Sequence, residues 1–188
     1  MKSFAIFYLL LCSCALCQDV RFIREDITFE LSKEYFAVEG NYWFANPSDR
    51  GSERSIYYPF PTTGQNNSVD SVDIFDITHG IRPEISDRTK SGFSFVLTIS
   101  GHDTVLYHIA YRQKVGGDSA MYILRSTRAW NRPLEFAEYK LAVEDSITII
   151  GFSYHPDKVY VIEGKKFFLW RRTNFMPEKD FVVRFKAK

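Results

Sequence analysis

The sequence predicts an all-β protein, an antiparallel β-sandwich of roughly twelve short strands. Apolar and polar side chains alternate with a period of two along most of the 188 residues. Clusters of Gly, Pro, Asn and Asp separate the alternating runs, as turns separate strands. No run has the spacing of an amphipathic helix. A β-barrel has the same strand signature and is the alternative fold.

The alternating runs place the expected strands in order along the chain. The clearest run is residues 93–99, in which Phe and aliphatic side chains occupy every second position. Residues 100–103, Ser-Gly-His-Asp, predict a tight hairpin between this strand and the next. The full set of expected strands is 27–31, 36–44, 56–61, 69–78, 93–99, 105–111, 120–127, 137–143, 147–154, 159–163, 166–172 and 181–185.

Composition indicates a single folded domain with a large aromatic core. The chain is 45% hydrophobic and 25% charged, with 17 Phe, 11 Tyr and 3 Trp. Its 24 Lys and Arg balance 23 Asp and Glu, and this near-neutral balance argues against nucleic acid as a partner. We expect one β-sandwich domain over residues 18–188.

Residues 1–17 have the pattern of a signal peptide. A single charge, Lys2, precedes an apolar run that ends at Cys17 and is too short to span a bilayer comfortably. The chain is therefore expected to be exported, to the periplasm, the cell surface or the medium. An uncleaved membrane anchor is the alternative.

Two processing routes fit this segment. Cleavage after Cys17 would release a chain that begins at Gln18, which we favour. Leu11-Cys-Ser-Cys14 is similar to a bacterial lipobox, and lipid on Cys14 would tether the domain to a membrane. All three cysteines lie in this segment, so the domain that follows has no disulfide and no thiolate metal site. An exported domain without disulfides fits the bacterial periplasm or surface.

The sequence offers little support for catalysis. Its histidines, His79, His102, His108 and His155, lack the one-turn spacing of a helical metal motif. It contains no nucleophile elbow and no phosphate-binding loop. We expect a protein that is not an enzyme and that has no cofactor and no metal site. A hydrolase with a site built from loops is an alternative, which a cleft holding His79, His102 or His155 beside a carboxylate would favour.

Aromatic residues are the one compositional excess and supply the candidate binding surface. Trp43 lies opposite the apolar set of its own strand, and is the best candidate for exposure. Tyr57 and Trp170 lie in other aromatic runs. Trp130 precedes Pro133 in a loop that is either a structural plug, which we favour, or a binding rim. A row of coplanar exposed rings among them would indicate a carbohydrate-binding module.

Two stretches resemble signatures of a known group. Residues 38–49 followed by 58–61 resemble Y-x-F-x-N-x-S-D … FPxP, and residues 122–136 resemble YxLxT-x-x-x-W-x-x-P-L. Both are similar to sequences of exported bacterial proteins of unknown function that are predicted to fold as β-sandwiches. Ser126-Thr127 stand where that group usually has Thr-Gly. The resemblance implies export and fold, and no activity.

These expectations combine into one functional hypothesis. The protein is an exported, non-catalytic β-sandwich that acts as a protein-interaction module at the cell envelope, through a sheet edge or an aromatic patch. Its partner is a protein of the envelope or a glycan. Membrane contact is expected only through a lipid on Cys14.

Overall fold

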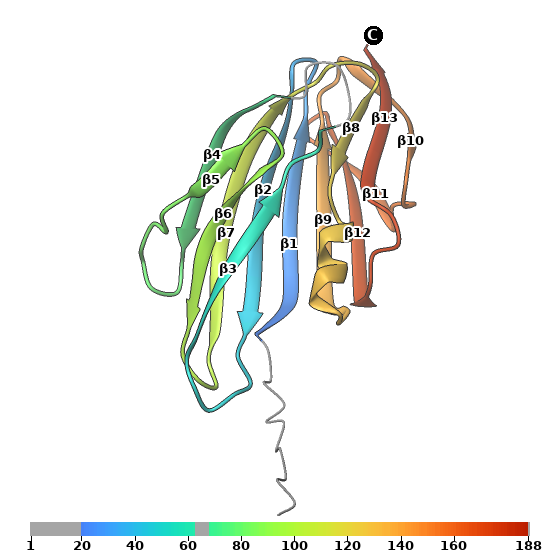
Figure 1. The fold of residues 1–188 in the computed structure, drawn as a ribbon. Helices are drawn as coiled ribbons and strands as arrows, with labels where there is room; N and C mark the ends of the chain where they lie inside the picture. The colour runs from blue at the N-terminus through green and yellow to red at the C-terminus, as the bar shows by residue number, and fades with distance from the viewer. Residues whose placement is uncertain (1–19, 63–67, 188) are drawn as a thin grey trace, which may run out of the picture.

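The computed structural model describes residues 20–62 and 68–187. These residues form thirteen β-strands and one short 3₁₀ helix, η1 (Figure 1). The all-β class predicted from the sequence is confirmed. The elements are β1 (Arg21–Leu31), β2 (Tyr35–Ala45), β3 (Ser52–Pro59), β4 (Val69–Asp76), β5 (Ser86–Thr89), β6 (Gly92–Ile99), β7 (Thr104–Lys114), β8 (Ser119–Tyr122), η1 (Arg125–Trp130), β9 (Leu134–Val143), β10 (Ile147–Phe152), β11 (Lys158–Ile162), β12 (Lys165–Phe175) and β13 (Phe181–Ala187).

The strands are arranged as three sheets in two layers. One layer is a seven-stranded sheet of order β11-β12-β9-β1-β2-β7-β4. Two three-stranded sheets, β3-β6-β5 and β10-β13-β8, cover one face of it. Phe29 of β1 stacks on Phe181 of β13 with ring centroids 4.6 Å apart, and Tyr42 of β2 meets Tyr58 of β3 at 5.8 Å. The predicted sandwich is therefore confirmed, because the strands lie in stacked sheets and not in one sheet closed on itself.

The core lies between the layers and is produced by the period-two alternation. In β7, Val105, Tyr107, Ile109 and Tyr111 are all buried, while the residues between them face solvent or are half-buried. One continuous core cluster contains side chains from all three sheets. Burial of so many aromatic rings supplies the main stabilisation of the fold.

Two connections differ from the sequence prediction. Residues 100–103 do not close a hairpin, because β6 and β7 belong to different layers and are not paired. Each strand has one apolar face, and the turn carries the chain across the core so that these faces meet, with Phe95 5.4 Å from Tyr107. In addition, β1 and β9 are parallel, whereas every other pair among the described strands is antiparallel.

The second layer is interrupted where its two sheets approach each other. β3 and β8 are edge strands of their sheets, and no ladder joins them within the described residues. η1 follows β8 closely in the chain and packs against β1. The interruption therefore gives access to the inner face of β1 and β2.

The predicted signal peptide, residues 1–17, and its Cys14 lie outside the described residues. Within the described residues, no helix is both long enough and apolar enough to span a membrane.

Candidate binding pocket

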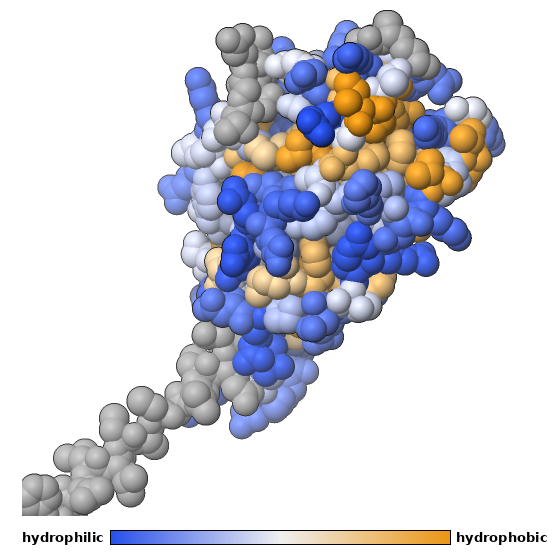
Figure 2. All heavy atoms as spheres, turned by 90° about the vertical axis from the view of Figure 1, so that its right-hand side faces the viewer, coloured by the Kyte–Doolittle hydropathy of each residue, from blue (hydrophilic) through white to orange (hydrophobic). Residues whose placement is uncertain are grey.

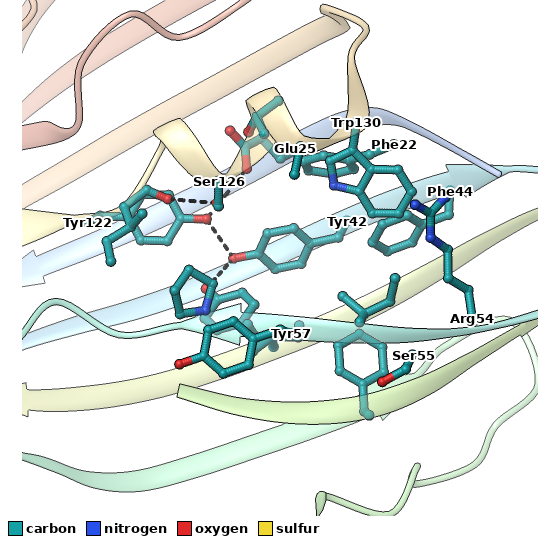
Figure 3. A pocket seen from close by; sticks show the side chains of 18 residues that line it. Phe22, Glu25, Tyr42, Phe44, Arg54, Ser55, Tyr57, Tyr122, Ser126 and Trp130 are labelled. Atoms are coloured by element: carbon teal, nitrogen blue, oxygen red, sulfur yellow. Dashed lines mark hydrogen bonds between the residues drawn. The ribbon is translucent and has the colours of Figure 1, made fainter. Parts of the chain in front are cut away.

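A pocket of about 300 Å³ opens at the interruption of the second layer. Its floor is the inner face of the seven-stranded sheet, with residues from β1, β2 and β7. β3 forms one wall, and the end of β8 with η1 forms the other (Figure 3). Most of the lining is apolar, and a few polar groups converge at its closed end, which is the composition of a typical ligand site.

Aromatic rings form the η1 side of the pocket. The Trp130 ring packs against Phe44 at a centroid distance of 5.4 Å and against Phe22 at 5.9 Å. The Arg54 guanidinium of β3 lies over the outer part of this wall, 4.8 Å from the Trp130 ring centroid. The wall therefore already holds a cation on an aromatic face.

Glu25 lines the closed end and is 1% exposed. Its Oε1 accepts a hydrogen bond of 2.5 Å from the Tyr139 hydroxyl, and its Oε2 lies 3.5 Å from the Tyr122 hydroxyl. Burial raises the pKa of the Glu25 carboxyl to about 7, although the hydrogen bonds from Tyr139 and Tyr122 act in the opposite direction. Glu25 is therefore a carboxyl group that changes charge near neutral pH.

A β-bulge in β1 places Phe22 on the same face as Glu25. The register with β2 shifts between Phe22 and Arg24, so the strand contains one extra residue, Ile23. Phe22 and Glu25 consequently face the core together, although they are three positions apart and strict alternation would place them on opposite faces. Regular alternation from Ile27 and Phe29 then continues to the end of the strand.

Two further tyrosines, Tyr42 and Tyr58, extend the polar group at the closed end. The Tyr42 hydroxyl is hydrogen-bonded to the Tyr58 hydroxyl at 2.7 Å and to the Tyr122 hydroxyl at 3.2 Å (Figure 3). Burial raises the pKa of all three tyrosines, so they stay neutral across the physiological range. Each hydroxyl can turn to donate or accept a hydrogen bond, and the network can therefore adapt to a ligand.

Gly40 makes room for this arrangement. A Cβ atom at position 40 would collide with the ring and hydroxyl of Tyr42. Glycine therefore allows Tyr42 to lie close over the β2 backbone and to direct its hydroxyl toward Tyr58 and Tyr122.

The pocket offers a buried carboxyl group, hydroxyl groups and aromatic rings. The buried carboxyl group can accept or donate hydrogen bonds, and the rings can stack on an apolar or cationic group. None of the four histidines is among the residues that line the pocket. Among the described residues, no group of three or more His, Cys, Asp or Glu side chains is placed to hold a metal ion.

The structure brings two of the four predicted surface aromatics together. Tyr57 and Trp130 both line the pocket, on its β3 and η1 sides. Trp43 lies on the opposite face of the seven-stranded sheet, where the Arg24 guanidinium covers it at 4.5 Å. Trp170 is 1% exposed and its Nε1 donates to the Tyr154 carbonyl, so its assignment to a binding surface was wrong. The rings that alternation sends inward fill the core, and these residues form no exposed row.

The histidines are dispersed. His79 Nδ1 lies 2.7 Å from Asp76 in the turn after β4, and His102 Nε2 lies 2.6 Å from Asp49 at the turn that joins β6 to β7. These are local pairs, and neither borders the pocket. His79 and His102 thus each pair with a carboxylate outside the pocket.

A wider hollow of about 1360 Å³ lies at the far end of β4 and β7. It is lined mainly by exposed residues, including Lys33, Arg88, Lys90 and Lys114. Solvated charges of this kind do not define a site, in contrast to the buried carboxyl of Glu25.

No protein-family model matches the chain, and no curated protein matches it. Solved structures do resemble it. A Legionella pneumophila protein proposed to bind nutrients matches with a TM-score of 0.65 at 14% identity, over 88% of this chain and 66% of that one. An M1 zinc metallopeptidase from Deinococcus radiodurans matches with a TM-score of 0.51 at 11% identity, over 88% of this chain and 42% of that one.

A variant of a two-domain M1 zinc metallopeptidase bound to L-arginine matches similarly, with a TM-score of 0.50 at 12% identity and the same two coverages, 88% and 42%. This chain thus spans less than two thirds of each of these proteins. At such low identities the similarity shows a shared fold and carries no activity with it.

Sequence reasoning missed Glu25 and the tyrosines around it. A glutamate in a strand is expected to face solvent, because its charge is costly to bury. The sequence did contain one indication of this burial. Glu25 lies an even number of positions from Ile27, Phe29 and Leu31, and a strand places such residues on the same face. A carboxylate on the apolar face of a strand is the pattern that marks a buried polar site.

Proposed function

We propose that this protein is a non-catalytic binding module whose ligand occupies the pocket between β3 and η1. The observation that carries the proposal is the pocket itself, an aromatic cavity with a buried carboxyl group and three tyrosine hydroxyls at its closed end. Burying a carboxyl group carries a free-energy cost, and buried ionisable groups of this kind gather at functional sites. The Legionella protein of similar fold, proposed to bind nutrients, is compatible with such a role.

Fluorine-labelled tryptophan provides the test. The chain has 3 Trp residues, which report on three different places. Trp130 lines the pocket, Trp43 lies on the outer face and Trp170 is buried in the core. We expect small aromatic fragments that bind to shift the Trp130 fluorine resonance and to leave the other two unchanged.

A blocked pocket serves as the matched control. Ile56→Trp would place a bulky ring on the inward face of β3, in the pocket, and Val96→Trp, exposed on the neighbouring strand β6, controls for the added ring. The I56W variant should lose the fragment-induced shift at Trp130, and V96W should keep it. Fragments that shift Trp43 instead, or that still bind I56W, would contradict the proposal.

We also propose that the module acts outside the cytoplasm, in the periplasm, at the cell surface or in the medium. The support is the signal-like sequence of residues 1–17 and the absence of cysteine from residues 18–188. Mass spectrometry of the mature protein tests this. A first residue of Gln18 indicates release, a lipidated Cys14 indicates anchoring, and an intact cytosolic chain that begins at Met1 would contradict export.

A second candidate function is protein interaction at the free edge of β11. Val159, Val161 and Ile162 on this edge strand are 50–63% exposed. Figure 2 shows apolar side chains gathered on this side of the molecule, bordered by polar ones. An unpaired, apolar strand edge is a template for strand addition, and Lys158 and Lys166 beside it favour a segment that carries acidic residues. The occupant would be an extended segment of an envelope protein.

Lysine substitution at the edge tests this second function. Val161→Lys should abolish capture of an extended partner segment, since a charge at an edge blocks strand addition. Val96→Lys is the matched control, because Val96 is 52% exposed on the central strand of the β3-β6-β5 sheet, away from this edge. Equal binding by both variants would contradict an interaction through β11.

A further inference from the structure

We infer that the pocket selects an organic cation, an ammonium or guanidinium group on an apolar stem, with Glu25 as its counter-charge. This inference rests on the proposed binding function and adds the chemical class of the ligand. The cation would reach toward the closed end, while its stem would lie among the rings of Phe22, Phe44 and Trp130.

The first argument is the missing counter-charge. Among the described ion pairs none involves Glu25. The nearest basic residue in sequence, Arg24, points to the other face of the sheet, where it pairs with Asp26. A buried carboxylate without a cation is costly, so a cationic ligand would gain more there than at a solvated carboxylate.

The second argument is the hydrogen-bonding state of Glu25. Oε1 is occupied by the short hydrogen bond from Tyr139, whereas Oε2 has only the long contact of 3.5 Å with Tyr122. Oε2 therefore retains acceptor capacity toward a donor in the pocket. Ammonium and guanidinium groups are donors without acceptors, and they match this capacity.

The third argument is the aromatic wall. The rings of Phe22, Phe44 and Trp130 would pack against the apolar stem. Arg54 of the chain itself already occupies the cation position over Trp130, so the cation of the ligand would lie at Glu25. An anionic ligand would meet the Glu25 carboxylate and would be repelled. The charge and the rings thus favour the same class of ligand.

The groups that surround Glu25 leave it as the one that titrates near neutral pH. Tyr139 of β9, Tyr122 of β8 and Tyr42 of β2 are all buried, and burial keeps their pKa values above the ordinary range of tyrosine. Tyr58 of β3 is shifted in the same direction, and Asp26 beside Glu25 faces the opposite side of the sheet. Affinity for a cation should therefore rise with pH as Glu25 loses its proton.

The test compares two probes of similar shape and different charge. 2-Phenylethylammonium carries the cation on an aromatic stem, and 2-phenylethanol carries a neutral hydroxyl in its place. Calorimetry and the Trp130 fluorine resonance measure the binding of both to the full chain. A blocked Gly-Gly-Lys-Gly-Gly peptide then distinguishes a free amine from a lysine side chain of a protein as the source of the cation.

We expect 2-phenylethylammonium to bind at least about tenfold more tightly than 2-phenylethanol, because a buried carboxylate favours the charged probe. Glu25→Gln should remove this preference, so that the two probes bind E25Q with similar affinity. Glu39→Gln, the same change at an exposed position on the other face of β2, should bind both probes as the unmodified chain does. Independently of any variant, the ammonium affinity should increase between pH 5.5 and 8, and the alcohol affinity should not.

The outcomes separate the two proposals. Equal affinities for the two probes, both detected at Trp130, would overturn the cation preference and leave the binding function in place. An ammonium preference that survives in E25Q, or that is independent of pH, would overturn the role of Glu25. If neither probe shifts the Trp130 resonance, the binding function of the pocket is refuted, and the cation preference is refuted with it.

Discussion

Glu25 is the residue at which the fold departs most clearly from the rule that charged side chains face water. It is buried, it has a pKa of about 7, and the described ion pairs give it no cation. Most other residues of β1 follow this rule. Phe29 and Leu31 are buried, and Thr28 and Glu30 are exposed. Such local exceptions occur chiefly where function requires them.

The buried carboxyl group predicts how stability depends on pH. In the unfolded chain Glu25 has an ordinary pKa near 4.5, whereas burial raises it to about 7 in the folded chain. Below pH 4.5 both states hold the proton. Between 4.5 and 7 the unfolded chain releases it first, so the free energy of unfolding falls as pH rises, by on the order of 3 kcal/mol in total at pH 8.

Urea unfolding at pH 5 and pH 8 measures this effect. Glu25→Gln keeps an acceptor for Tyr139 and cannot ionise, so its stability should lose that part of the pH dependence. Relative to the unmodified chain, E25Q should gain stability at pH 8 and not at pH 5. The Glu39→Gln control should follow the unmodified chain at both pH values, and parallel curves for all three proteins would refute the buried charge.

At the scale of elements, the turn between β6 and β7 is decisive because it links the two layers. Gly101 in this turn lies against the backbone of Asp49 in the loop between β2 and β3, where an added Cβ would collide with a carbonyl oxygen and carbon. Backbone atoms cannot swing aside as a side chain can. The position therefore requires glycine for close approach.

Gly101→Ala should destabilise the protein by about 1–3 kcal/mol, the usual range for overpacking at a rigid site. Gly51→Ala is the matched control in the neighbouring loop, because a Cβ at position 51 meets the nearest atom at an ordinary 3.5 Å. Thermal unfolding followed by circular dichroism compares the two variants. Similar melting temperatures for G101A and G51A would show that the two loops do not pack closely.

The elements also show how far the sequence predicts this fold. Alternation locates the strands well, as in β7 and β9, because each strand buries one face. Alternation does not tell which strands pair. Residues 100–103 were therefore predicted to form a hairpin, whereas the chain crosses there from one layer to the other. Alternation also cannot place η1, since Arg125–Trp130 has no helical periodicity and is held by tertiary contacts of Trp130.

The candidate site was predictable only in part. Tyr57 and Trp130 were identified from their residue type, and both line the pocket. Trp170 was identified on the same ground and is buried, because residue type does not report on burial. The pocket depends on the separation of β3 from β8 and on the bulge at Ile23, and neither feature has a sequence signature.

For the whole molecule, the sheet order predicts where the structure opens first. β1, β2 and β9 lie inside the seven-stranded sheet, with hydrogen-bonded neighbours on both sides. β5 and β11 are short edge strands, and all residues of β5 are exposed. Local openings are expected to start at such edges, where few contacts must break.

Native-state hydrogen exchange checks this prediction. Amide protons of β1, β2 and β9 should exchange at least about a hundredfold more slowly than those of β5 and β11, because they exchange only through near-global unfolding. Val38 and Leu141 are suitable reporters of the centre, and Asp87 and Val161 of the edges. Uniform protection across the strands would indicate that the sheets unfold as one unit.

The parallel pairing of β1 with β9 has a consequence for biosynthesis. The first strand of the fold remains without one of its two neighbours until the ribosome has made residues 134–143. Until then the hydrogen-bonding edge of β1 is open to other chains, and the nascent polypeptide is at its most vulnerable to aggregation. Chaperones that hold the growing chain extended would protect it best during this interval.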